Sequence, residues 1–90
     1  MQVQGELLII NKRGLHARAA AKLVNTANQF VSNIRIGFPE RLVDGKNIMS
    51  VMMLAASQYT LLQTEIQGQD AQQAYAALHD LFARRFDEDE

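Results

Sequence analysis

Residues 14–30 read GLHARAAAKLVNTANQF, and this stretch contains the helix around which we arrange the rest of the chain. Its apolar residues recur at steps of three and four, the spacing of one face of an α-helix. They are Ala19, Ala20, Leu23, Val24, Ala27 and Phe30. Arg18 and Lys22 lie among the polar residues of the opposite side. We therefore expect an amphipathic helix from His16 to Phe30, preceded by a turn at Gly14.

The segments before and after this helix show strand and helix patterns in turn. Alternating apolar residues and turn signals predict strands at 3–10, 34–38, 41–43 and 59–67, with further helices at 48–56 and 71–86. Asp70 and Gln73 are spaced as an N-cap and its partner three residues on. The order β-α-β-β-α-β-α predicts one α+β domain over residues 1–90, with its helices on one face of a sheet.

Composition narrows the class of protein. The chain has 90 residues, 48% hydrophobic and 21% charged, and a net charge of -1, so a nucleic-acid partner is not indicated. The absence of cysteine excludes disulfides and thiolate metal sites and fits a reducing compartment, so we expect a cytoplasmic protein. No apolar run approaches the roughly 20 residues of a membrane span. The acidic end at 87–90 has no apolar anchor, and we expect it to fray in solvent.

His16 departs from the residue types that usually begin a helix. It lies at or beside the N-cap of the first helix, where Ser, Thr, Asp or Asn would normally accept from the unpaired N–H groups. Those groups and the positive end of the helix are left to bind an anion. Imidazole can act as a covalent nucleophile, and the guanidinium fork of Arg18 matches phosphate oxygens. A phosphoryl carrier follows as a hypothesis, although spacing alone leaves open that His16 simply starts a helix beside a solvated Arg18.

The sequence lacks the residues that a hydrolase site or a metal site would require. No Ser or Cys is placed as a nucleophile against His16, and no carboxylate lies near it in sequence to orient a base, although distant residues could approach it in space. Two histidines, with no cysteine and no clustered carboxylates near them in sequence, predict no metal site, and nothing calls for a cofactor. His79 is expected to have a structural or solvent role on the last helix. An independent enzyme would need more catalytic groups and a substrate pocket.

The second predicted helix is apolar on nearly every side. Its residues include Ile48, Met49, Val51, Met52, Met53 and Leu54. One short helix in a small domain cannot bury all of them, so some should be exposed as contact groups for partners. Ala17 and Ala21 form a strip of small residues on the first helix, where the backbone would stay approachable. Filling of the core remains the alternative for each of the second-helix residues taken singly.

Two motifs carry a resemblance to a known family. Gly14-Leu15-His16-Ala17-Arg18-Ala19-Ala20 resembles the phosphorylation site of the histidine-containing phosphocarrier proteins, HPr, of the phosphotransferase system. Residues 44–56, DGKNIMSVMMLAA, look like the second helix of that family and its lead-in. The resemblance covers essentially the whole chain. It implies an open-faced sandwich, with a four-stranded antiparallel sheet and three helices on one face.

The resemblance also implies a function. The chain would be a phosphocarrier of a phosphoenolpyruvate-dependent system, accepting a phosphoryl group on Nδ1 of His16 from an Enzyme I and passing it to a IIA protein. Arg18 would stabilise the phosphoryl group. The residues that fall where such carriers dock their partners are Ala17, Ala21, Ile48, Met49 and Met52. The chain would be a monomer that works without a cofactor and does chemistry only with its partner proteins.

Details of the sequence are similar to the nitrogen-related branch of the family, NPr. Ala19 stands where the sugar carriers usually have proline, and the chain has an acidic end after Arg85-Phe86. A sugar-branch HPr, or a docking module of the same fold in which His16 stays unmodified, are the alternatives. Asn47 occupies the position of the serine that a kinase modifies in some carriers, and it has no hydroxyl to phosphorylate. Asn47 suits instead the N-cap of the second helix.

Overall fold

The computed structural model describes residues 1–90 and contains one four-stranded antiparallel sheet. Its strands are β1 (Gln2–Leu8), β2 (Asn33–Phe38), β3 (Arg41–Asp44) and β4 (Leu61–Gln67), in the order β1-β4-β2-β3. The helices are α1 (Ala17–Ala27), α2 (Ile48–Met52) and α3 (Ala71–Ala83), followed by a short turn, η1 (Arg85–Asp87). The predicted order of strands and helices is confirmed.

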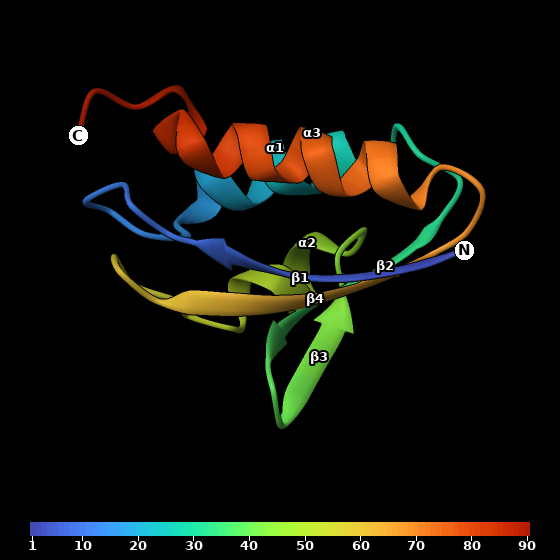
Figure 1. The fold of residues 1–90 in the computed structure, drawn as a ribbon. Coiled ribbons are helices and arrows are strands. Elements are labelled where there is room, and N and C mark those ends of the chain that lie inside the picture. The colour runs from blue at the N-terminus through green and yellow to red at the C-terminus, as the bar shows by residue number, and fades with distance from the viewer.

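The helices lie together on one face of the sheet. Figure 1 shows α1 and α3 as a layer above the strands, with the short α2 lower, close to the strands. Alternation along β4 explains this arrangement, because Leu62, Thr64 and Ile66 are buried while the residues between them are more exposed. In the register, Leu62 pairs with Leu7 of β1 and Ile66 with Ile34 of β2, so one continuous apolar face meets the helices.

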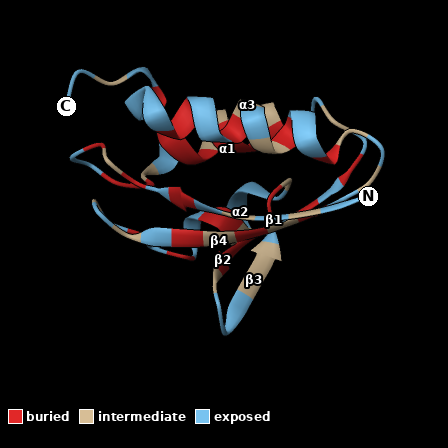
Figure 2. Ribbon diagram, viewed as in Figure 1, coloured by how far each residue is buried: buried red, intermediate tan, exposed pale blue.

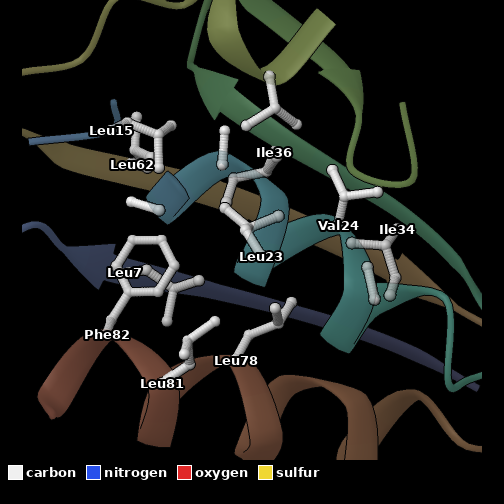
Figure 3. Packing of buried hydrophobic residues seen from close by; sticks show 14 of the residues in the cluster. Leu7, Leu15, Leu23, Val24, Ile34, Ile36, Leu62, Leu78, Leu81 and Phe82 are labelled. Carbon is white, nitrogen blue, oxygen red and sulfur yellow. The ribbon is translucent and has the colours of Figure 1, made fainter. Parts of the chain in front are cut away.

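The core lies between the sheet and the two longer helices. In Figure 3, Leu23 of α1 points toward Ile36 of β2, and α3 supplies Leu78 and Phe82 from the other side. Figure 2 shows the same division, with buried segments on the helix surfaces that face the sheet and exposed ones on the outer surfaces. This burial fixes where α1 begins and therefore where His16 lies. None of the helices has the length and apolar character required to cross a membrane.

All three predicted helices end earlier in the structure. The first was expected to reach Phe30, but α1 ends at Ala27. The second was expected to reach Ala56, but α2 ends at Met52 and Ala55 has a left-handed backbone with φ 52°. The last was expected to continue to Phe86, but α3 ends at Ala83 and the three residues of η1 all have positive φ. Left-handed residues cannot continue a right-handed helix. Apolar periodicity places Phe86 correctly in the core but does not reveal the reversal of the chain.

The predicted capping box at the start of α3 is wrong. Asp70 is the N-cap residue by position, but its side chain makes no capping hydrogen bond. Its carboxylate instead accepts hydrogen bonds from the backbone N–H of Val31 at 2.9 Å and from the N–H of Ser32 at 3.0 Å, and also from the Ser32 hydroxyl. The hydroxyl bond and the backbone bonds outweigh partial burial and lower the pKa of Asp70. This residue therefore ties α3 to the segment before β2.

The acidic end is ordered against the domain, in contrast to the frayed tail expected from its composition. Phe86 is fully buried, and its ring lies 4.8 Å from that of Phe82 between centroids. Lys22 of α1 donates to the Phe86 carbonyl and to the Asp87 carboxylate, each at 3.1 Å. The anchor is an apolar residue immediately before the tail, so the composition of 87–90 alone could not show it. Figure 1 shows the end of the chain above the loop that connects β1 and α1.

Candidate functional site

The loop after β1 delivers His16 through a glycine that no other residue could replace without strain. Gly14 has φ +68°, and a Cβ built there would lie 2.7 Å from the carbonyl oxygen of Ala56. The next residue, Leu15, donates its backbone N–H to the same oxygen at 2.9 Å. The left-handed backbone and the close approach both favour glycine. The segment after α2 thus holds the loop at the point where α1 begins.

His16 is the N-cap of α1, as predicted, and it leaves the start of the helix unfilled. Its backbone is extended, with φ -72° and ψ 178°, and its side chain makes no capping hydrogen bond. The first intrahelical bond joins the Ala20 N–H to the His16 carbonyl at 2.8 Å. The N–H groups of residues 17–19 therefore have no intrahelical partner. They form a cluster of donors at the positive end of the helix, suited to an anion.

The two nitrogens of the His16 ring differ in their surroundings. Nε2 contacts a carboxylate oxygen of Glu88, while Nδ1 has no hydrogen-bond partner in the protein. Nδ1 is also not among the buried unpaired polar atoms, so it is not fully buried. The side chain as a whole is 16% exposed. Nδ1 is therefore free to react, while Nε2 is engaged by Glu88.

Glu88 is held by a second partner, Asn11. The Asn11 amide donates to Glu88 Oε1 at 3.0 Å and to the Gly14 carbonyl at 2.8 Å, and Asn11 is fully buried. Partial burial of Glu88 opposes its ionisation, but hydrogen bonds from His16 and Asn11, with the charges of His16 and Arg13, outweigh it and lower the pKa of Glu88. Glu88 is therefore ionised at neutral pH.

Sequence reasoning missed both Asn11 and Glu88. No carboxylate lies near His16 along the chain, and Glu88, 72 residues away, is brought to it by the fold. The only sequence signal for the position of Glu88 was the apolar residue Phe86 just before the acidic end. Phe86 is buried in the core and anchors this end to the domain. A polar residue buried in a loop, as Asn11 is, carries no periodic pattern.

Arg18 lies on the exposed side of α1, as predicted. Its guanidinium makes no hydrogen bond or ion pair within the protein, and no direct contact joins it to His16. Since the residue belongs to the first turn of the helix, its side chain can reach an anion bound at the helix start. The structure therefore leaves a free cation beside the unfilled donors, with no carboxylate neutralising it.

The predicted partner-binding residues Ala17, Ala21, Ile48, Met49 and Met52 lie on α1 and α2 and are exposed or partly exposed. Met49 and Met53 are 64% and 62% exposed, Ile48 and Met52 are also exposed, and Val51 and Leu54 fill the core. Ala17 is exposed and Ala21 partly so, on the helix against which α2 packs. Asn47 Oδ1 accepts from the Ser50 N–H at 3.1 Å, so its predicted N-cap role is confirmed. His79 lies exposed on α3 with its ring near Tyr75 and has no hydrogen bond or ion pair.

Comparison with known proteins connects this arrangement to a family. The family model described as the PTS HPr component phosphorylation site matches residues 3–84. The phosphocarrier protein HPr of Pseudomonas aeruginosa is 51% identical over 86 residues, which cover 94% of this chain and 96% of that protein. HPr of Xylella fastidiosa is 49% identical over 87 residues, covering 97% of this chain and 98% of that protein.

Solved structures show the same fold. The crystal structure of HPr-C-His from Thermoanaerobacter tengcongensis superimposes with a TM-score of 0.92 at 38% identity, covering 98% of this chain and 99% of that one. A structure of an HPr dimer from the same organism has a TM-score of 0.75 at 40% identity, with 91% and 94% of the two chains covered. The matches in sequence and in structure, both extending over almost the whole chain, show that this protein belongs to the HPr family of phosphocarriers of the phosphotransferase system.

Proposed function

We propose that this chain carries a phosphoryl group on Nδ1 of His16, accepting it from an Enzyme I and passing it to a IIA protein of the nitrogen-related branch. Proteins of the HPr family interact with Enzyme I and IIA proteins in general. The observation that carries the proposal is the unfilled start of α1, where His16 caps the helix by position and its side chain does not.

The surroundings of His16 suit a phosphoryl group better than they suit an unmodified histidine. The N–H groups of residues 17–19 can donate to phosphoryl oxygens, and Arg18 supplies a cation with no partner of its own. Both would offset the negative charge that arrives with the group. Nδ1 has no hydrogen-bond partner in the protein and is not fully buried, which leaves it available to donor and acceptor proteins. No enclosed pocket is required for such a transfer.

The exposed apolar residues of α2 supply the surface on which those proteins would dock. Met49 of α2 and Met53 immediately after it are exposed, and α2 packs against α1, so the apolar surface adjoins the helix that His16 precedes. Flexible thioether side chains can adapt to more than one partner. This property suits a carrier, which must bind a donor and an acceptor in turn with the same face.

The nitrogen-related branch is supported by two features of the sequence. Ala19 stands where the sugar carriers usually have proline, and an acidic segment follows Phe86. Asn47 caps α2 in place of the regulatory serine, so control through a hydroxyl at that position is absent. Acceptor choice would therefore be set by the docking surface and the tail rather than by phosphorylation of α2.

The test is intact-mass spectrometry at neutral to alkaline pH after incubation with phosphoenolpyruvate and Enzyme I. We expect one acid-labile phosphate on the wild type and none on His16→Ala. The labelled protein is then offered to a nitrogen-related IIA and to a sugar-specific IIA, and faster loss of label to the former is expected. Equal transfer to both would remove the branch assignment, while absence of label with an active Enzyme I would remove the carrier function itself.

A further inference from the structure

We infer that Glu88 is a positioning residue for phosphoryl transfer, holding the proton of His16 on Nε2 and thereby leaving the lone pair of Nδ1 as the acceptor. This inference rests on the proposed function. It concerns a residue outside the segment that matches the family model, which ends at residue 84.

The hydrogen-bonding capacity of each group determines where the proton lies. An ionised carboxylate can only accept hydrogen bonds, so the ring nitrogen that contacts Glu88 Oε2 must be the donor. The other oxygen, Oε1, accepts from the buried Asn11 amide at 3.0 Å. With both oxygens engaged, the carboxylate has a defined orientation. The neutral His16 ring then has its hydrogen on Nε2 and its lone pair on Nδ1.

The contact lies in a protected place and is anchored on both sides. The His16 and Glu88 side chains are 16% and 15% exposed, so water competes with the contact far less than it does at an open surface pair. On the tail side, Phe86 is buried and Lys22 binds the Asp87 carboxylate at 3.1 Å. Three successive left-handed residues, 85–87, turn the chain back toward α1. Such a backbone is costly for residues other than glycine and is retained where the surroundings hold it.

The orientation matters for the reaction itself. The Nδ1 lone pair forms the nitrogen–phosphorus bond while the bond between phosphorus and the donor breaks, and the donor keeps that electron pair. The ring retains its Nε2 hydrogen and gains positive charge, which the Glu88 carboxylate offsets. Transfer onward reverses these changes. A carboxylate that orients a histidine through the nitrogen not used in the chemistry acts in the same way beside catalytic and metal-bound histidines.

The alternative to a positioning role is a blocking role, in which the Glu88 side chain covers His16 and limits access to it. The two roles predict opposite effects of removing the side chain, because a cover slows transfer and a positioning residue speeds it. Asp89 supplies a matched control. It is exposed, it carries the same charge on the same tail, and it makes no hydrogen bond or ion pair. We therefore compare Glu88→Ala with Asp89→Ala.

The first measurement needs no donor protein. Proton NMR of the unmodified wild type is expected to show an Nε2–H resonance of His16, protected from exchange by the carboxylate. The resonance should persist in Asp89→Ala and disappear in Glu88→Ala. Circular dichroism and thermal unfolding establish that both variants remain folded. Absence of the resonance from the folded wild type would overturn the inference.

The second measurement follows the nitrogen that is phosphorylated. Phosphoramidate transfers its phosphoryl group to imidazole and releases ammonia, without any protein donor. Phosphorus NMR is expected to find the group on Nδ1 alone in the wild type and in Asp89→Ala, and on both nitrogens in Glu88→Ala. With Enzyme I, we expect transfer to Glu88→Ala to be about tenfold slower than to Asp89→Ala.

Each outcome bears on the role of Glu88. Transfer to Glu88→Ala that is equal to or faster than transfer to Asp89→Ala would overturn the inference, as would labelling of Nδ1 alone in Glu88→Ala. Equal slowing of the two variants would show that only the charge of the tail matters, and would overturn it as well. If Enzyme I labels none of the proteins while phosphoramidate gives the expected pattern, the proposed function fails and the orientation of His16 by Glu88 stands.

Discussion

The first turns of α1 and α2 differ in what fills them. At α2, Asn47 Oδ1 accepts from the Ser50 N–H at 3.1 Å, which satisfies one of the donors at the start of the helix. At α1, the His16 side chain makes no such bond and turns to Glu88 instead. The first arrangement stabilises a short helix, and the second leaves donors free for a ligand. A helix start that departs from the usual capping residues is therefore the one to examine for chemistry.

The start of α3 shows that the type of the N-cap residue does not by itself decide whether its side chain caps the helix. Asp70 is a favoured capping residue, but its carboxylate is engaged by Val31 and Ser32 in another segment. At α1 the departure is in the residue type, and at α3 it is in where the side chain bonds. Only at α1 do an unfilled helix start, a free cation and a nucleophile coincide. This combination distinguishes the start of α1, as a binding site, from the start of α3, where the N-cap side chain only has a structural role.

The largest expected effect comes from giving α1 the capping residue of α2. His16→Asn and His16→Ala both remove the acceptor nitrogen, so both should lose all phosphoryl labelling by intact-mass spectrometry. Both also lose the contact with Glu88, and they differ in the capping oxygen. His16→Asn should therefore be the more stable of the two by about 1 kcal/mol in urea unfolding. Equal stabilities would show that the start of α1 cannot be capped by a side chain.

A smaller effect is expected from removing the free cation. Arg18→Ala keeps the nucleophile but removes one donor to the phosphoryl oxygens, so transfer should slow by about tenfold in both directions. Arg18 is exposed, which places the effect below that seen in enclosed sites. Stopped reactions analysed by mass give the rates, and Arg41→Ala on β3 is the control for loss of an exposed arginine. Rates equal to those of Arg41→Ala would remove Arg18 from the site.

Comparison of the two helix starts also predicts that a change at the N-cap of α2 alters the stability of the protein but not the phosphorylation of His16. Asn47→Ala removes the capping oxygen and should lower the free energy of unfolding by about 1 kcal/mol, with His16 still labelled normally. Asn47→Asp keeps an accepting oxygen and should retain most of the stability. Urea unfolding and labelling by Enzyme I check both halves. A loss of labelling in Asn47→Ala at full folding would mean that the two helix starts are coupled.

The smallest expected effect is a release of the tail in acid. Asp87, hydrogen-bonded by Arg84 and Lys22, and Glu88, hydrogen-bonded by His16 and Asn11 near Arg13, both have lowered pKa values in the folded protein. The stability they contribute is present above the ordinary carboxyl pKa values of about 4 and is lost as the pH falls through the lower folded values. Carboxyl carbon shifts of Glu88, followed by NMR from neutral pH downward, should move together with the His16 ring signals.

Release of the tail should leave the rest of the domain folded, because the sheet and α1 are held by apolar burial that does not titrate. Lys22→Ala removes one anchor of the tail and should shift the release to higher pH. A tail that stays attached down to global unfolding would show that Phe86, rather than the carboxylates, holds it.

The sequence by itself determined the order of the strands and helices and the position of His16 at the start of α1. These depend on periods of two and of 3.6 residues and on turn residues, which act over a few positions. It also indicated that α2 has more apolar residues than one short helix can bury, which the exposure of Met49 and Met53 confirms. The family resemblance followed from motifs that are equally local.

The tertiary structure alone decided which distant residues meet. The strand order β1-β4-β2-β3, the bonding of Asp70 to Ser32 and the contact of Glu88 with His16 join residues far apart in the chain. No local pattern encodes such contacts, because they depend on how the apolar faces of the sheet and helices stack and on where the chain turns back after α3. The acidic end looked like a solvated tail for this reason. Burial of Phe86 and the left-handed turn at 85–87 bring it to the site.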